Sequence, residues 1–114
     1  MFDSLKNLGQ LTQLMGKAQK LQEEMKKLQS QLATRRVTGD AGGGRVVATV
    51  SGRLELIEIR IDRERTDVDN VEMLQDLITA AVRSAQYKAA VMVQEEMKRL
   101  SDELGIPPEM LPQA

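Results

Sequence analysis

The segment Val37–Asp62 constrains the fold most, because it is the only part of the chain rich in both β-branched residues and glycine. Two runs within it, residues 46–50 and 54–61, predict strands. Ser51-Gly52 between them predicts a two-residue turn, since glycine can adopt a positive φ without a Cβ clash. In the second run the apolar residues change phase near Leu56-Ile57. This change indicates a β-bulge, a strong twist, or a strand that is apolar on both faces.

A third, short strand is predicted at Val37-Thr38, ahead of these two. The residues from Gly39 to Gly44 are mostly glycine and predict a tight turn. A phosphate-binding loop is the alternative for Gly42-Gly43-Gly44, but such loops lead into a helix and this one leads into a strand. A sheet of two or three short strands is marginal alone, so the flanking segments must cover it.

Both flanking segments have the apolar periodicity of helices. From Leu11 to Thr34 an a/d heptad runs for about three repeats, the lower limit for a coiled coil. Its a positions are Leu11, Ala18, Met25 and Leu32, and its d positions are Leu14, Leu21 and Leu28. The second helix is predicted from Asn70 to Leu104, with Asp69-x-x-Glu72 as a capping box and Gly105 as the C-cap.

The core of such a chain must be thin. The sequence has one Phe, one Tyr, no Trp and seven Met, so burial depends on aliphatic residues, Met and Ala. A helix from Asn70 to Leu104 would be about 52 Å long, and a private core of 114 residues cannot cover it along its whole length. We therefore expect an obligate oligomer.

Much chemistry is excluded by composition. The chain has no Cys and no His, which rules out disulfides, Cys/His zinc sites, Cys nucleophiles and His-based triads. Glu55 and Glu58 alternate with apolar residues, as solvated strand positions do, and no general base is paired with a nucleophile. We predict no enzymatic activity, no cofactor, no metal and no small-molecule substrate. Without a signal peptide pattern or a membrane-length apolar run, we expect a soluble, cytoplasmic protein with no membrane partner.

The charges are distributed unevenly along the chain. Residues 1–36 carry seven Lys and Arg against three Asp and Glu, a net charge of +4, whereas residues 37–68 carry −1 and residues 69–114 carry −4. Charge pairing within or between subunits is one interpretation of this dipolar pattern. A basic surface that meets phosphate is the other.

Several motifs resemble the YbaB/EbfC nucleoid-associated proteins. Leu14 to Met25, LMGKAQKLQEEM, is similar to the family's opening helix, and Val37 to Gly44, VTGDAGGG, is similar to its glycine-rich signature. Further motifs follow in the family order: Ile59-Arg60-Ile61-Asp62, Leu74-x-x-Leu77-Ile78-x-Ala80-Ala81 and Gly105-Ile106-Pro107-Pro108-Glu109-Met110. The chain departs from the family at Arg63, where Pro is frequent, and at Leu111-Pro112-Gln113-Ala114, which stands in place of a terminal LPF.

The resemblance implies an α+β fold with a long helix, a three-stranded antiparallel sheet whose first strand is short, and a second long helix. Over a single domain, 1–114, it implies a basic helical arm (1–36), a sheet and dimer core (37–62), a long acidic helix (69–104) and a Pro-containing tail (105–114). The implied assembly is a homodimer joined through the sheet, with projecting helices. The implied function is binding of double-stranded DNA in the nucleoid, altering its conformation, helping to organise it and affecting gene expression.

The candidate DNA contacts are cations, because Lys offers phosphate a point charge and Arg a planar fork. The leading set is Lys17, Lys20, Lys26, Lys27, Arg35 and Arg36, and the secondary set is Arg83 and Lys88. For each Lys the competing interpretation is a solvated position beside the heptad. The lack of aromatic residues disfavours single-strand binding. Gln19, Gln22 and Gln29 could reach base edges, but we favour backbone and shape readout.

A helical scaffold or chaperone is the alternative function. Helix, hairpin and helix in a chain of this length is also the layout of a prefoldin-type subunit, whose coiled-coil arms hold unfolded chains. Such arms need two sustained heptads of similar length. Here the first predicted helix is shorter, and the second loses its heptad phase near Lys88.

Overall fold

The chain folds into two long helices joined by a small sheet. The computed structural model describes residues 2–107, and their side chains from residue 7 onward. The order is α1 (Phe2–Thr34), β1 (Arg36–Ala41), β2 (Val46–Ser51), β3 (Leu56–Ile61) and α2 (Val71–Leu104). This order confirms the predicted α+β fold. Of the predicted tail over 105–114, the residues from Pro108 to Ala114 lie outside the described part, as does Met1.

The three strands form an antiparallel sheet in the order β1-β2-β3. Gly39 of β1 lies opposite Ala48 of β2, and Ala48 lies opposite Ile59 of β3. The register shifts between Thr49 and Val50, whose partners on β3 are Glu58 and Leu56, so Ile57 is the extra residue. Of the three alternatives that the phase change left open, the structure shows the bulge.

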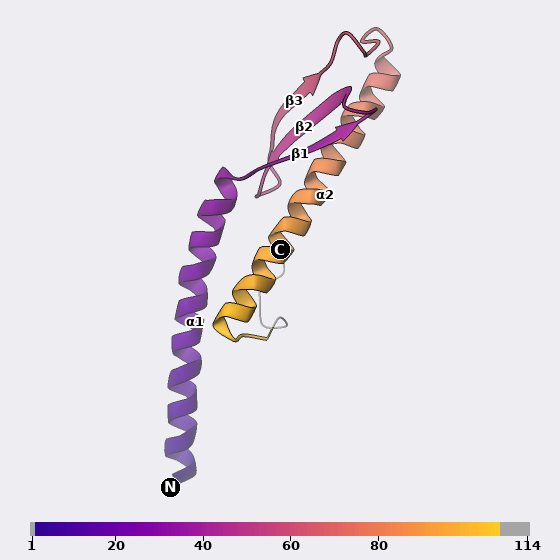
Figure 1. The fold of residues 1–114 in the computed structure, drawn as a ribbon. Helices are drawn as coiled ribbons and strands as arrows, with labels where there is room; N and C mark the ends of the chain where they lie inside the picture. Colours follow the sequence, from indigo (N-terminus) through magenta and orange to yellow (C-terminus); the bar gives the residue numbers. More distant parts are fainter. Residues whose placement is uncertain (1, 108–114) are drawn as a thin grey trace.

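One face of the sheet packs on the N-terminal half of α2 (Figure 1). The inward side chains of the central strand, Val46, Ala48 and Val50, are fully buried there. They meet a stripe of small residues on α2, namely Ala81, Ala85 and Ala89, which are fully buried too. Small side chains at this spacing let the helix axis approach the sheet closely, because they share one helix face.

A second core cluster joins the two helices farther along. Leu28 and Leu32 of α1 pack against Met97 and Leu100 of α2. After the left-handed C-cap at Gly105, Ile106 folds back and is buried, and its carbonyl accepts a hydrogen bond from the Ser101 hydroxyl. The heptad predicted for α1 thus packs against α2 only in its C-terminal half.

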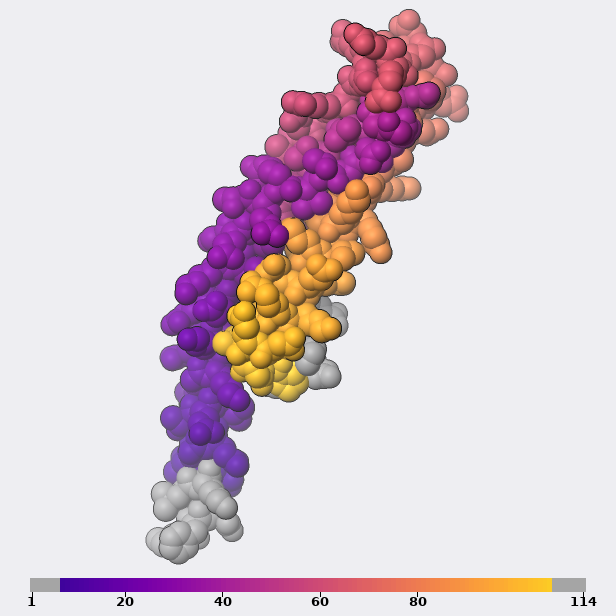
Figure 2. Space-filling view, in the orientation of Figure 1, coloured from indigo at the N-terminus to yellow at the C-terminus, as the bar shows by residue number. Residues whose placement is uncertain are grey.

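The molecule is a rod, with principal extents of 79 × 21 × 17 Å. The sheet covers one end of α2, and α1 runs along the other end. The space-filling view shows α1, in indigo and purple, continuing past the C-terminal end of α2, in yellow (Figure 2). Part of α1 therefore projects from the body.

Three details of the turns and strands differ from the predictions. The first strand is six residues long and includes Gly39, so the glycine turn begins only at Gly42. The connection between β2 and β3 spans residues 52–55 rather than two residues. Its positive φ lies at Leu54, at 67°, and not at Gly52. The Ser51 N–H donates to the Glu55 carbonyl at 2.9 Å, and the Leu54 N–H donates to the Ser51 carbonyl at 2.9 Å, which closes this loop.

The helix starts differ as well. α1 begins at Phe2, well before the Leu11 at which its regular heptad starts. The N-cap of α2 is Asn70, whose side-chain oxygen accepts a hydrogen bond from the Met73 N–H at 3.2 Å. The predicted capping box, which placed the N-cap one residue earlier at Asp69, was therefore wrong. The prediction of Gly105 as C-cap is confirmed.

Candidate nucleic-acid interface

The C-terminal part of α1 carries exposed lysines. Lys17, Lys20, Lys26 and Lys27 are all exposed, because the heptad places them off the apolar stripe that packs on α2. Three of them have no ion-pair partner among the side chains that the structure describes. The fourth, Lys27, lies 3.6 Å from Glu24, with its side chain still 70% exposed. These cations are free to meet an external anion.

The four lysines do not form one patch. Lys17, Lys20 and Lys27 are spaced by three and seven residues, so they share one side of the helix. Lys26 precedes Lys27 and therefore points about 100° away around the axis, on another side. A flat anionic surface could not contact all four lysines of one copy at once. A groove or a curved backbone that wraps the helix could contact lysines on both sides.

The side with Lys17 and Lys20 continues onto the end of α2. Gln13, Gly16, Lys17 and Lys20 line a shallow hollow together with Glu103 and Leu104. Carboxylates near this hollow would weaken an anion site if they were free.

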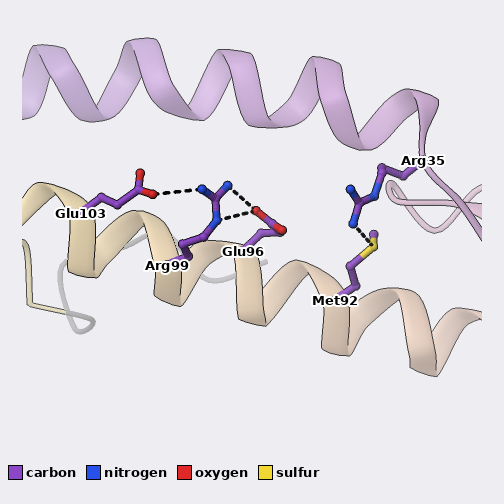
Figure 3. Close-up of polar contacts among 5 residues, drawn as sticks. All are labelled: Arg35, Met92, Glu96, Arg99 and Glu103. Carbon is purple, nitrogen blue, oxygen red and sulfur yellow. Dashed lines mark hydrogen bonds and ion pairs between the residues drawn. The ribbon is translucent and has the colours of Figure 1, made fainter.

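Arg99 partly neutralises the negative charge of the carboxylates near this hollow (Figure 3). Its guanidinium donates to Glu96 Oε2 at 2.6 and 3.1 Å and to Glu103 Oε1 at 3.0 Å. The hydrogen bond and charge of Glu96, followed by the charge of Glu103, raise the pKa of Arg99 above its ordinary value. Sequence reasoning did not single out Arg99, although its i,i+3 and i,i+4 acidic neighbours signal such a pairing. Its effect is to reduce the negative charge beside the α1 lysines.

Arg35 and Arg36 have structural contacts at the end of α1. Arg35 Nη2 lies 3.5 Å from Met92 Sδ of α2 (Figure 3). Arg36 Nη1 donates to the carbonyls of Ala33 and Arg35, at 3.1 and 3.2 Å. These bonds satisfy carbonyls at a helix C-terminus, where positive charge is favoured. Both arginines remain exposed and can still present charge to a ligand.

The secondary candidates lie apart from the α1 lysines. Arg83 and Lys88 are exposed on the half of α2 that carries the sheet. α1 packs against α2 only from Met92 onward. The structure therefore separates Arg83 and Lys88 from the α1 lysines, whereas Arg35 of the leading set reaches α2 at Met92, one turn from Lys88.

Arg65 lies at the end of the sheet that carries the glycine turn. Arg65 Nε donates to Asp62 Oδ2 at 2.7 Å, and its Nη1 donates to the Gly43 carbonyl at 3.2 Å. This bond to Arg65, more than any other contact, lowers the pKa of Asp62 below its ordinary value. The contacts fasten the glycine turn to the β3–α2 connection. The turn leads into β2 and not into a helix, which confirms a tight turn over a phosphate loop.

Among the side chains of residues 7–107, no group of carboxylates is arranged to hold a metal ion. Among the helices the structure describes, none is long and apolar enough to cross a membrane.

The geometry defines a helix–sheet–helix protein with a cationic first helix and no catalytic constellation among its described residues. Comparison with known sequences gives the family: the chain belongs to the YbaB/EbfC DNA-binding family, whose profile matches residues 7–104. A nucleoid-associated protein of Pelotomaculum thermopropionicum is 44% identical over 99 residues, covering 87% of this chain and 94% of the relative. One from Clostridium acetobutylicum is also 44% identical over 99 residues, covering 87% and 88%.

A solved structure shares the fold. The crystal structure of an uncharacterized protein from Helicobacter pylori matches with a TM-score of 0.56 at 21% identity, covering 74% of this chain and 93% of that one. The family match confirms the predicted recognition and the nucleoid-associated, DNA-binding function, and it decides against the chaperone alternative. It is a DNA-binding family rather than an enzyme family. The helix-length argument used against the chaperone was wrong, since the two helices have 33 and 34 residues.

Proposed function

We propose that the chain is a homodimeric nucleoid protein that binds duplex DNA through the phosphate backbone, using the lysines of α1. The observation that carries this proposal is the combination of family membership with Lys17, Lys20 and Lys26, which are exposed and have no acidic partner among the described side chains. We infer that binding alters the conformation of DNA and helps to organise the nucleoid. Relatives named nucleoid-associated proteins support this location.

Backbone contact suits the side chains that α1 presents. Lysine supplies a flexible point charge that follows phosphates without reading bases. The exposed Gln22 and Gln29 lie among these lysines and can add hydrogen bonds to sugars or base edges. Tyr87, exposed on α2, is the single tyrosine of the chain and offers no stacking platform next to the lysines. We therefore propose duplex binding with modest sequence preference.

A second copy would join at the open edge of the sheet. β3 is an edge strand, and Leu54, Leu56 and Ile57 in and beside it are 41%, 51% and 45% exposed. Native proteins rarely leave an apolar strand edge uncovered. A dimer through this edge would bring two basic arms into one particle. Lysines on different sides of each arm could then serve separate DNA segments, which is the geometry needed to bridge or bend DNA.

The salt dependence of duplex affinity tests the proposal. If n phosphates are neutralised, the logarithm of the binding constant falls linearly with log salt, by about 0.9n. Lys26→Gln should lower the steepness by roughly one phosphate contact per protomer on unrelated duplexes alike. Fluorescence anisotropy with two labelled duplexes of different sequence gives this slope.

The matched control is Lys98→Gln, which removes the same charge from an exposed position on α2. It should leave the slope unchanged. Equal slopes for wild type and Lys26→Gln, or a loss confined to one duplex sequence, would contradict backbone binding by α1.

A further inference from the structure

The projecting part of α1 includes an uncharged segment that is apolar on one side. Residues 7–16, NLGQLTQLMG, contain no Asp, Glu, Lys or Arg, in a chain that is 29% charged. Leu8, Leu11, Leu14 and Met15, which we call the distal stripe, are 58%, 53%, 55% and 63% exposed. A run of large exposed aliphatic side chains on one helix side marks a surface that is covered by something.

The distal stripe continues a surface that is already an interface. Leu28 and Leu32 belong to the same heptad as Leu11 and Leu14, and they are buried against α2. α2 ends at Leu104, which lies beside Gly16 and Lys17 in the shallow hollow. The intramolecular partner therefore stops where the distal stripe begins. The exposed part of the heptad has no helix of its own copy packed on it. We therefore expect a second helix to pack there as α2 packs on Leu28 and Leu32.

We propose that the distal stripe docks on the distal stripe of a second copy of this chain, with the two α1 helices antiparallel. A stripe of exposed aliphatic side chains is self-complementary, so the same patch can serve both partners of a two-fold interface. The stretch carries no charge that would oppose the approach of its copy. This contact lies at the end of the rod away from the sheet edge, so it would link one particle to another.

The orientation follows mainly from where the two protein bodies would lie. In a parallel pair Lys17 and Lys20 of both copies would lie side by side. In an antiparallel pair with Leu11 opposite Leu14, Lys17 faces Leu8, and the two Lys17 side chains are about 13 Å apart along the axis. That separation exceeds the Debye length of about 8 Å at physiological salt. The antiparallel pair also places the two protein bodies at opposite ends, where they do not collide.

DNA and lipid fit this surface less well. Phosphate is bound by cations, and residues 7–16 have none. Helices that lie on a membrane surface carry Lys and Arg on their polar face, and here that face carries Thr12, Gln13 and the glycines.

Two glycines weaken this part of α1, so that packing against a partner is needed to stabilise the helix. Gly9 and Gly16 are seven residues apart on the side of the helix away from the distal stripe, and an added Cβ at either would meet nothing within 4 Å. Each lowers the stability of a helix by about 1 kcal/mol relative to Ala. Packing against a second helix offsets such a loss, as tertiary contacts do for most protein helices.

The contact is small, so it should be weak. Four side chains from each copy bury much less than the ~1,200 Å² that marks the low end of stable interfaces. We expect association at about micromolar concentrations or above, where high local protein concentration favours it. The proposal does not rest on DNA binding, and its tests contain no DNA.

Sedimentation equilibrium of the full chain over a range of concentrations tests the contact. The mass-average mass of the wild type should rise with concentration above that of Leu14→Glu and should not stop at twice its value, because a dimer through the sheet edge carries two distal stripes. Gln13→Glu adds the same charge just outside the distal stripe and should behave as wild type. Leu14→Ala keeps the helix propensity and should also lose the rise, which separates lost contact from lost helix. Identical curves for wild type and both Leu14 variants would overturn the proposal.

Cross-linking tests the orientation, because the chain has no cysteine of its own. A mixture of Leu11→Cys and Leu14→Cys should oxidise mainly to the mixed disulfide if the helices are antiparallel. Gly16→Cys, on the side of the helix away from the distal stripe, should cross-link least. Preferential like-with-like disulfides would overturn the antiparallel register. Equal yields at all three positions, or co-sedimentation with phosphatidylglycerol vesicles in place of self-association, would overturn the docking surface itself.

Discussion

Gly39 and Gly52 lie where two backbones come into contact. A Cβ on Gly39 would be 2.2 Å from the Ala85 nitrogen and 2.8 Å from the Ala81 oxygen of α2. A Cβ on Gly52 would be 2.7 Å from the Leu32 oxygen, which accepts the Gly52 N–H at 3.0 Å. Both glycines were expected to serve turns. Their function is instead to let β1 approach α2 and to let the β2–β3 loop approach the end of α1.

Gly39→Ala should therefore destabilise the fold. The new methyl group meets backbone atoms that cannot rotate away, so the strand and helix must separate. Overpacking of this kind costs about 1–3 kcal/mol, at times more. Urea denaturation followed by circular dichroism measures the change. Gly16→Ala makes the same substitution where nothing lies within 4 Å, and it should raise stability or leave it unchanged. Equal effects of the two variants would contradict the close approach.

Asp62 should titrate below an ordinary aspartate. The Arg65 guanidinium stabilises its ionised form, so its pKa is lower in the folded chain than in the unfolded chain. The stabilising contribution is present above the unfolded pKa of about 3.9 and is lost as pH falls through the folded value. NMR titration of the carboxyl group measures the folded pKa. Arg65→Gln should bring it back toward the ordinary value, whereas Arg63→Gln should leave it low. An ordinary pKa in the wild type would refute the pairing.

The helices and strands were largely predictable because their signals are local. The phase change on β3 indicated a bulge as one of three alternatives, and Gly105 followed by proline predicted the end of α2. Where the prediction failed, the deciding partner lies far away in sequence. Gly39 was assigned to a turn because its partner, Ala85, is 46 positions away in the sequence.

The candidate site was predictable only as a set of charges. Heptad spacing shows that Lys17 and Lys26 are off the apolar stripe, which the structure bears out by their exposure. Periodicity on one helix does not show where the second helix ends. Lys17 and Glu103 line the same hollow, and Arg99 pairs with Glu96 and Glu103 beside it. Only the structure shows that these groups lie together.

The start of α2 allows a direct choice between adjacent caps. Asn70→Ala should lower stability by about 1 kcal/mol, because the Met73 N–H loses its acceptor. Asp69→Ala should have little effect, since its neighbour is the N-cap. Thermal denaturation of the two variants measures the difference. A larger loss for Asp69→Ala would restore the predicted capping box.

At the scale of the whole molecule, two surfaces remain open at opposite ends of a rod. The edge of β3 and the distal stripe are separated by the α1–α2 packing, so neither contact hinders the other. A particle with two such surfaces can grow beyond a dimer. Association through the sheet edge would set the basic unit, and the weaker contact at the helix ends would connect units when they are crowded.

The proposed dimer contact at the sheet edge can be tested by introducing a charge there. Ile57→Lys places a charge in the proposed dimer contact at a position that is 45% exposed, so the protomer should still fold. We expect this variant to sediment as a protomer at dilutions where the wild type is a dimer. Val68→Lys, at a comparable exposure of 40% on the connection before α2, should remain dimeric. A dimeric Ile57→Lys variant would place the dimer contact elsewhere.

The length of the cationic part of α1 also limits the length of duplex DNA that it could contact. From Lys17 to Arg36 the helix and its first strand residue rise about 29 Å at 1.5 Å per residue. Duplex DNA advances about 3.4 Å per base pair, so this length matches about eight base pairs, less than one helical turn. Under the proposed backbone contact, one arm would therefore fit a single groove crossing, and a duplex of about nine base pairs would be the shortest that spans it.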